Sequence, residues 1–150
     1  MAKVGRLPIR PEVEALHEQI VATRRDFHEH PELSWQEQRT QRVILERLRE
    51  FGLKDVRPIA KTGATGLIEG GKKGRCVLWR ADMDALPVPE KSALPYASKT
   101  ADVMHACGHD THMAIGLGIA EALSGRKEKF AGSVRFVFQP AEEAAGGAQA

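Results

Sequence analysis

The nine residues from Met104 to His112 constrain the fold of this chain more than any other stretch of its sequence. They contain three histidines, one cysteine and one aspartate, the side-chain types that bind zinc and similar divalent cations. Gly108 lies between Cys107 and His109, and a glycine there allows a tight turn that points both neighbouring side chains to one place. We therefore expect Cys107 and His109 to begin a metal site, which the fold completes with groups from elsewhere in the chain.

The second half of the chain predicts a strand, a loop, a helix and a strand. The apolar run over residues 76–79 predicts a strand covered on both faces, so Cys76 is expected to be a small buried residue. Residues 85–103 are rich in Pro, Ala, Ser and Lys, which predicts a long loop. A mostly apolar helix is expected over residues 111–123 and a strand over residues 133–138. A strand, a crossover helix and a second strand predict a parallel pair.

The first half of the chain predicts two helices and one edge of a sheet. One helix runs from Pro11 to just before Pro31, on the spacing of its apolar residues. A second helix begins near Ser34, where Ser34 and Glu37 match a capping box, and ends with Gly52 as a left-handed cap. Two short strands, the first containing a proline and therefore expected at a sheet edge, and then a turn are predicted over residues 55–59, 65–69 and 72–74.

The composition is that of an ordinary soluble globular protein, and its 150 residues are enough for one domain with a core. A formal net charge of +2 gives no reason to expect a nucleic-acid partner. The two cysteines do not suggest a disulfide framework, which fits a reducing compartment. The first residues lack a signal-peptide-like apolar segment, and no apolar run approaches the roughly 20 residues of a membrane span. We therefore expect a cytoplasmic protein with no membrane partner.

Three separated segments bring chemically active groups to one edge of the predicted sheet. Ligand sites in sheets of this kind lie beyond the carboxyl ends of the parallel strands. The groups at that edge are Asp82 and Asp84 after the first strand, Cys107 and His109 before the helix, and Glu142 and Glu143 after the second strand. This convergence is stronger evidence for a site than the spacing within any one segment.

Charge indicates the chemistry of this predicted site. Two adjacent glutamates and two aspartates at one edge repel each other unless a cation lies among them. A divalent metal offsets that repulsion and lowers the pKa of a water molecule that it binds. One glutamate can then coordinate the metal, while its neighbour takes a proton from the water and later returns it to a leaving amine. The pattern therefore suits hydrolysis of an amide bond.

Four stretches of the sequence together resemble a known family. They are residues 24–34, 80–87, 104–112 and 138–143. In this order they resemble the amidohydrolase branch of the co-catalytic metallopeptidases, which includes hippurate hydrolase, indole-acetyl-amino acid hydrolases, N-acyl amino acid amidohydrolases and thermostable carboxypeptidases. The resemblance implies an α/β fold, a three-layer sandwich with a largely parallel mixed sheet flanked by helices.

The resemblance also implies a role for each residue that matches a family motif. Cys107, His109 and Glu143 are expected to be metal ligands. Glu142 is expected to be the general base, and Asp84 matches an acidic position that supports the metal site. The family hydrolyses N-acyl amino acids or small peptides with a pair of divalent cations, often manganese, zinc, nickel or cobalt.

The chain departs from the family in length. Family members have two further metal-binding histidines and an inserted lid domain that often dimerises, whereas this sequence has no histidine after His112. We therefore expect residues 1–150 to be the N-terminal part of the metal-binding catalytic domain, without the lid domain or the C-terminal part, and to be impaired or inactive alone. We also expect an exposed apolar strand edge and a tendency to form homo-oligomers.

Two other functions remain open on the sequence alone. Cys107 could be the nucleophile of a thiol hydrolase with a nearby histidine as base, although such chemistry has no use for a carboxylate cluster. Alternatively, the chain is a non-catalytic metal-binding or interaction fragment, although closed structural zinc sites usually have four Cys or His ligands. His105 and His112 either orient the ligands or form local hydrogen bonds. For His28 and His30, packing or helix-end hydrogen bonding is at least as expected as a substrate role.

Overall fold

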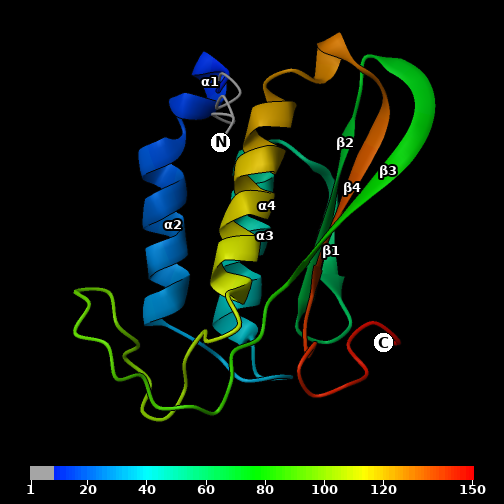
Figure 1. The fold of residues 1–150 in the computed structure, drawn as a ribbon. Helices are drawn as coiled ribbons and strands as arrows, with labels where there is room; N and C mark the ends of the chain where they lie inside the picture. Colours follow the sequence, from blue (N-terminus) through cyan, green and yellow to red (C-terminus); the bar gives the residue numbers. More distant parts are fainter. Residues whose placement is uncertain (1–8) are drawn as a thin grey trace, which may run out of the picture.

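Figure 1 shows residues 9–150, the part of the chain that the computed structural model describes, as one sheet with helices packed against it. The helices are α1 (Pro11–Glu14), α2 (His17–Glu29), α3 (Gln38–Glu50), α4 (His109–Ser124) and the 3-10 turn η1 (Lys127–Lys129). The strands are β1 (Lys54–Ile59), β2 (Gly63–Glu69), β3 (Lys72–Asp82) and β4 (Ala131–Gln139). The start of the chain, residues 1–8, where the sequence has no signal-peptide pattern, lies outside the described residues.

The strand order across the sheet is β1-β2-β4-β3, so β1 and β3 form its edges. The edge position of the proline-containing β1 agrees with the prediction. β3 and β4 pair in parallel, with Val77 opposite Val134, and α4 connects them. The pairs β1–β2 and β2–β4 are antiparallel. The predicted mixed α/β fold with flanking helices is therefore confirmed, with one parallel pairing among the three rather than a parallel majority.

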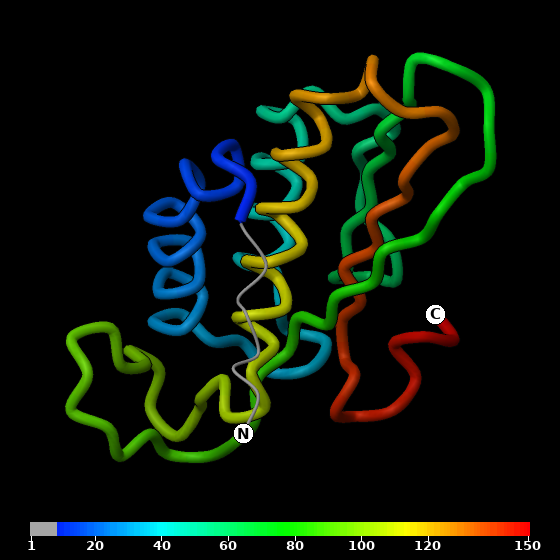
Figure 2. The backbone as a smooth tube through the Cα atoms, turned by 45° about the horizontal axis from the view of Figure 1, so that its top comes forward, coloured from blue at the N-terminus to red at the C-terminus, as the bar shows by residue number. Residues whose placement is uncertain are grey.

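Three chain segments have their ends at the same end of the sheet: β3, α4 and β4 (Figure 2). α3 and α4 pack against one face of the sheet, and α2 packs mainly against α4 (Figure 1). In Figure 2, the end of β3, the start of α4 and the end of β4 lie at the same end of the molecule. We call this end the carboxyl edge. Within residues 9–150, no helix is long and apolar enough to cross a membrane.

The core lies between the sheet and its helices. Its largest fully buried apolar side chains come from α2, α3, α4, β4 and the segment just after β3: Phe27, Ile44, Leu48, Met83, Met113, Phe136 and Phe138. The aromatic side chains of β4 pack under α4, where Gly116 allows close approach: a Cβ atom built there would lie 3.2 Å from the Phe138 ring. This packing therefore fixes the distance between the sheet and α4, and with it the position of the start of that helix.

The predicted capping box at the start of α3 is wrong, because both of its side chains bond to other segments. Instead, the carboxylate of Glu32 accepts hydrogen bonds from the backbone N–H groups of Arg39 at 3.0 Å and Thr40 at 2.8 Å. A carboxylate from the preceding loop thus satisfies two of the unpaired donors that begin a helix. The predicted end of this helix is confirmed, since Gly52 has a φ of 75°.

The single helix predicted between Pro11 and Pro31 is divided in the structure. α1 ends at Glu14 and α2 begins at His17, with a turn between them. The spacing of apolar residues continues across this turn, so the spacing alone does not reveal the break.

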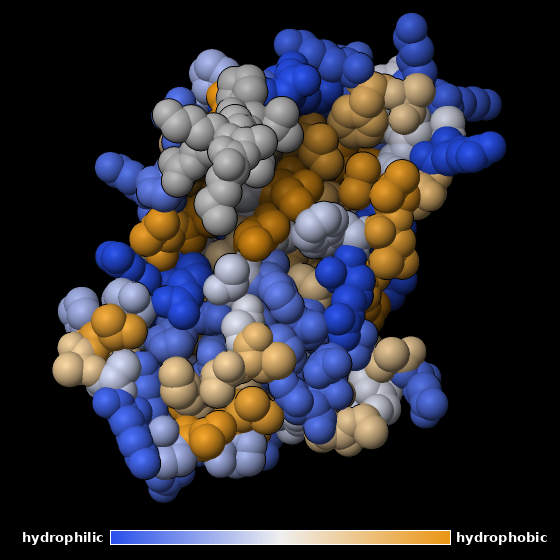
Figure 3. All heavy atoms as spheres, in the orientation of Figure 1, coloured by the Kyte–Doolittle hydropathy of each residue, from blue (hydrophilic) through white to orange (hydrophobic). Residues whose placement is uncertain are grey.

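β3 departs most from its prediction. The apolar run at residues 76–79 is not covered on both faces: Cys76 is exposed, and the exposed fractions of Val77 and Leu78 are 61% and 62%. Residues 72–74 belong to the strand and do not form the predicted turn. The reason is the strand order, which leaves β3 at the edge with β4 as its neighbour. The expected exposed apolar strand edge is therefore confirmed, and Figure 3 shows apolar surface in the region of β3, on the right of the view. Self-association stays a prediction.

Two leucine truncations test this difference in burial. Leu48 is fully buried in α3, so Leu48→Ala is expected to lower the free energy of unfolding by about 2–5 kcal/mol. Leu78→Ala removes the same atoms from an exposed position and is expected to cost less than about 1 kcal/mol. Urea unfolding of both variants measures the two values. Equal losses would contradict the edge position of β3.

Candidate metal centre

The carboxyl edge holds the six chemically active residues that the sequence singles out. Asp82 ends β3 and Asp84 follows it, while His109 begins α4 directly after Cys107 and Gly108. Glu142 and Glu143 lie shortly after β4, which ends at Gln139. The structure brings all of these segments together because β3 and β4 are parallel neighbours and α4 begins at the edge where both strands end.

Cys107, His109 and Glu143 form a cluster that we call the candidate metal centre. Each offers one donor atom, and the three atoms lie within 4.8 Å of one another. Nδ1 of the buried His109 lies 2.8 Å from the backbone carbonyl oxygen of Asp84, so it donates its hydrogen there and leaves Nε2 facing the other residues. The predicted turn at Gly108 is present, with a φ of 93°. The arrangement suits one divalent cation.

Two buried carboxylates hold the glutamate pair in place. Asp84 is 1% exposed and accepts hydrogen bonds from the backbone N–H groups of Glu142 and Glu143, each at 3.0 Å. Glu37 is fully buried and accepts one from the N–H of Ala141 at 2.8 Å. Ala141 has a φ of 48°, a region that non-glycine residues rarely adopt. Three consecutive N–H groups are therefore fixed by acidic side chains, so the backbone after β4 turns back to the centre.

The pKa directions show how negative this region is. Burial alone would raise the pKa of Asp84, but hydrogen bonds from His109, Ser34 and the two glutamate N–H groups hold that pKa well below its usual range. A hydrogen bond with Glu143, then burial, then nearby carboxylates raise the pKa of the Cys107 thiol. Burial works to lower the pKa of His109, but its contacts with Asp84 and the charge of Asp82 raise it. A cation among these groups would reverse the destabilisation of the thiolate.

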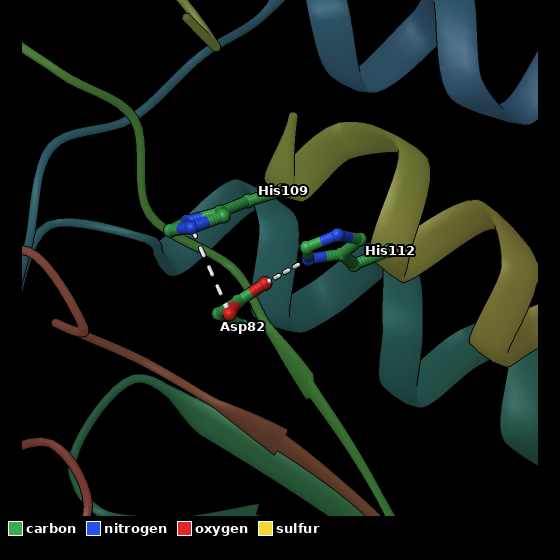
Figure 4. Close-up of side chains that lie close together, drawn as sticks. All are labelled: Asp82, His109 and His112. Atoms are coloured by element: carbon green, nitrogen blue, oxygen red, sulfur yellow. Dashed lines mark hydrogen bonds and ion pairs between the residues drawn. The ribbon is translucent and has the colours of Figure 1, made fainter. Parts of the chain in front are cut away.

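A second cluster lies beside the first and shares His109. Figure 4 shows Asp82 between the two histidines of α4, with Oδ1 2.6 Å from Nδ1 of His112 and Oδ2 3.7 Å from Nε2 of His109. Arg80 also donates a hydrogen bond to Oδ2 of Asp82 at 2.8 Å. The positive guanidinium of Arg80 already balances the negative charge of the Asp82 carboxylate. Electrostatics therefore favours a cation at this second cluster less strongly than at the candidate metal centre. His112 is thus a hydrogen-bond partner of Asp82, one of the two roles expected for it.

Sequence reasoning missed several polar residues near the centre. Ser34 donates a hydrogen bond to Oδ2 of Asp84 at 2.6 Å. Asp110 is fully buried and contacts His28. No spacing in the sequence indicates these contacts of Ser34 and Asp110, because each joins residues from different elements. His105, for which local hydrogen bonds were one of two expected roles, is 4% exposed, and within residues 9–150 neither of its ring nitrogens has a hydrogen-bond partner; burial lowers its pKa to about 4.

Replacing Asp84 tests its role in fixing the glutamate pair. In Asp84→Asn, one amide hydrogen must face a backbone N–H, so we expect the free energy of unfolding at pH 7 to fall by about 1–3 kcal/mol. The folded-state pKa of Asp84 is lowered, so its contribution is complete above the unfolded pKa, about 3.9, and is lost as the pH falls towards the folded value.

The loss in Asp84→Asn is therefore expected to shrink below about pH 4. Urea unfolding of both proteins at pH 7 and at low pH measures this change, and Asp102→Asn at an exposed loop position is the control. A difference that stays constant with pH would contradict the assignment.

Comparisons with known proteins agree on one relationship. Residues 78–150 match the family model described as peptidase family M20/M25/M40. An N-acetylcysteine deacetylase of Bacillus subtilis is 48% identical over 137 residues, which are 90% of this chain and 36% of the relative. A hippurate hydrolase of Campylobacter jejuni is 42% identical over 140 residues, 93% of this chain and 36% of the relative. The chain thus spans little more than a third of the length of these curated relatives.

A solved structure shows the same likeness in three dimensions. It is the crystal structure of a Bacillus subtilis protein described as a dinuclear metal binding peptidase from the M20 family. The two structures superpose with a TM-score of 0.86 at 46% identity, over 91% of this chain and 38% of that one. The resemblance carried by the four sequence stretches is therefore confirmed: over most of its length, the chain is similar to members of peptidase family M20/M25/M40.

Proposed function

We propose that this chain is part of a metal-dependent hydrolase that cleaves the amide bond of N-acyl amino acids or small peptides. One observation carries the proposal: the thiol, imidazole and carboxylate donors of Cys107, His109 and Glu143 lie within 4.8 Å of one another beside a second glutamate. The relatives named as a deacetylase and a hippurate hydrolase support the substrate class. The description of the B. subtilis structure supports a centre of two metal ions.

The donor atoms fit a cation of intermediate softness. A thiolate, an imidazole and a carboxylate together favour zinc, cobalt, nickel or manganese over magnesium or calcium. The raised pKa of Cys107 and the carboxylates around His109 indicate an excess of acidic groups at the centre. A divalent cation bound there polarises an amide carbonyl and lowers the pKa of water.

Glu142 is the proposed general base. Its backbone N–H is fixed by Asp84, while its side chain is 40% exposed and its Oε2 lies 4.0 Å from Nε2 of His109. The carboxylate is therefore free to take a proton from the attacking water as the oxygen bonds to the amide carbon. When the carbon–nitrogen bond breaks, Glu142 returns the proton to the leaving amine. Glu143, whose side chain is 27% exposed, faces the centre as a ligand.

A cysteine-nucleophile mechanism is less well supported. The group hydrogen-bonded to the Cys107 thiol is the carboxylate of Glu143, and this contact raises the pKa of the thiol. A nucleophilic cysteine needs the opposite, a lowered pKa beside a base or a positive charge. The same contact becomes favourable once a cation draws both groups to itself.

Cobalt binding tests the ligand assignment. Co²⁺ added to the chain is expected to give a thiolate-to-cobalt charge-transfer band. Cys107→Ser is expected to lose the band, and both it and Glu143→Gln are expected to weaken binding by about 100-fold or more, because each removes a ligand. Glu142→Gln keeps all three donors and is the matched control for Glu143→Gln. An unchanged band in Cys107→Ser would refute the thiolate ligand.

Turnover tests the base and the reaction. In the complete hydrolase of which we propose that this chain is part, Glu142→Gln is expected to lower kcat on N-acetyl amino acids or hippurate by about 10²–10⁴-fold, with metal affinity retained, because the variant cannot carry the proton. A chelator is expected to abolish turnover and added metal to restore it. Activity that survives chelation but is lost to iodoacetamide would instead favour the cysteine nucleophile. Metal binding without turnover of any such substrate would favour a non-catalytic metal-binding fragment.

A further inference from the structure

A buried polar cluster outside the candidate metal centre joins α2 to the start of α4. Asp110 is fully buried in the first turn of α4, directly after His109. Its Oδ2 lies 2.6 Å from Nδ1 of His28 and 2.9 Å from Nε of Arg24, and its Oδ1 accepts the backbone N–H of Thr111 at 2.8 Å. A buried carboxylate is costly unless it is paired in this way. The contacts of Asp110 therefore decide how the first turn of α4 is oriented.

The orientation of this turn matters for the metal centre because of helix geometry. Adjacent residues of an α-helix project about 100° apart, so His109 and Asp110 leave the first turn in different directions. His109 points to the carboxyl edge, where Nε2 lies 3.8 Å from the Glu143 carboxylate, while Asp110 reaches back to α2. A rotation of the turn that moves one of these side chains moves the other. The contact between Asp110 and His28 of α2 therefore influences the position of the His109 imidazole.

His28 is itself held on its other side. It is 2% exposed near the end of α2, and its Nε2 lies 3.3 Å from the carboxylate of Glu90 in the 85–103 loop. Glu90 also accepts the backbone N–H of Ser98 at 2.5 Å, and the Tyr96 ring packs edge-on against the imidazole, with ring centroids 5.8 Å apart. These contacts fix the ring, so that Nδ1 stays directed at Asp110.

We propose that His28, acting through Asp110, is a positioning residue of the metal centre that sets the His109 imidazole at the distance and angle at which it binds the cation. The inference rests on the proposed function, since it gives His28 a purpose only if His109 is a ligand. Residues that orient a metal ligand typically change metal affinity by about 10–100-fold when they are replaced.

Two substitutions of His28 separate this role from simple packing. Asparagine places its amide nitrogen near the position of Nδ1 and can keep the Asp110 contact. Glutamine places its amide nitrogen near Nε2, so it keeps the Glu90 contact and loses the one with Asp110. His28→Gln is therefore expected to weaken Co²⁺ binding by about 10–100-fold and to alter the cobalt spectrum, and His28→Asn to restore both. His17→Gln, an exposed change of the same kind in α2, is the control.

The experiment titrates Co²⁺ into each variant and records the visible spectrum, with circular dichroism to check the fold. If His28→Gln is folded and binds Co²⁺ as the unsubstituted chain does, the inference is overturned while the proposed function stands. If the unsubstituted chain shows no thiolate-to-cobalt band, the proposed function fails and the inference with it. If His28→Gln does not fold, Arg24→Gln replaces it, because this variant removes the other α2 contact with the same Asp110 oxygen from a side chain that is 30% exposed. Unchanged affinity in that variant also overturns the inference.

Discussion

The contact on which the rest of the carboxyl edge depends is the buried carboxylate of Asp84. It accepts the backbone N–H groups of Glu142 and Glu143 and the hydroxyl of Ser34, and its own backbone carbonyl receives Nδ1 of His109. Residues from four separated segments therefore meet at one residue. The three bonds to the side chain stabilise the ionised carboxylate, which offsets the cost of burying it. Asp84 thus links the glutamate pair directly to the imidazole, while Glu37 holds the neighbouring N–H of Ala141.

Sheet topology explains why such a meeting point exists at all. β3 and β4 are parallel neighbours, so the residues that follow them emerge at the same edge. The parallel pairing requires a crossover, and α4 supplies it while placing His109 in its own first turn. A βαβ unit of this kind delivers three sets of side chains to one place without any long-range pattern in the sequence. The chemistry is thus set by which residues stand at the ends of these elements.

This dependence on element ends decides how much of the site could be predicted. Asp84, His109 and Glu143 could be placed together from sequence, because each is adjacent to a recognisable strand or helix and the topology does the rest. The exposure of Val77 and Leu78 could not, since an apolar run does not tell a central strand from an edge strand, a difference set by the partners of β3. Nor could the roles of Ser34 and His28, whose partners lie 50 and 82 residues away. Their local patterns favour a helix cap and simple packing.

The charges around His109 support the proposed cation at this centre. Carboxylate oxygens of Asp82, Glu142 and Glu143 lie 3.7–4.0 Å from its Nε2, and Arg80 balances the first of these acids. Two acids and a thiol then share one imidazole nitrogen, which can carry either a proton or a metal ion. Contacts with Asp84 and the charge of Asp82 raise the pKa of His109, so a proton competes with a metal ion for this nitrogen. In the proposed centre, a metal ion would displace that proton and the thiol proton of Cys107, so its affinity would rise with pH. A divalent cation would also neutralise these acidic groups more completely than one proton does.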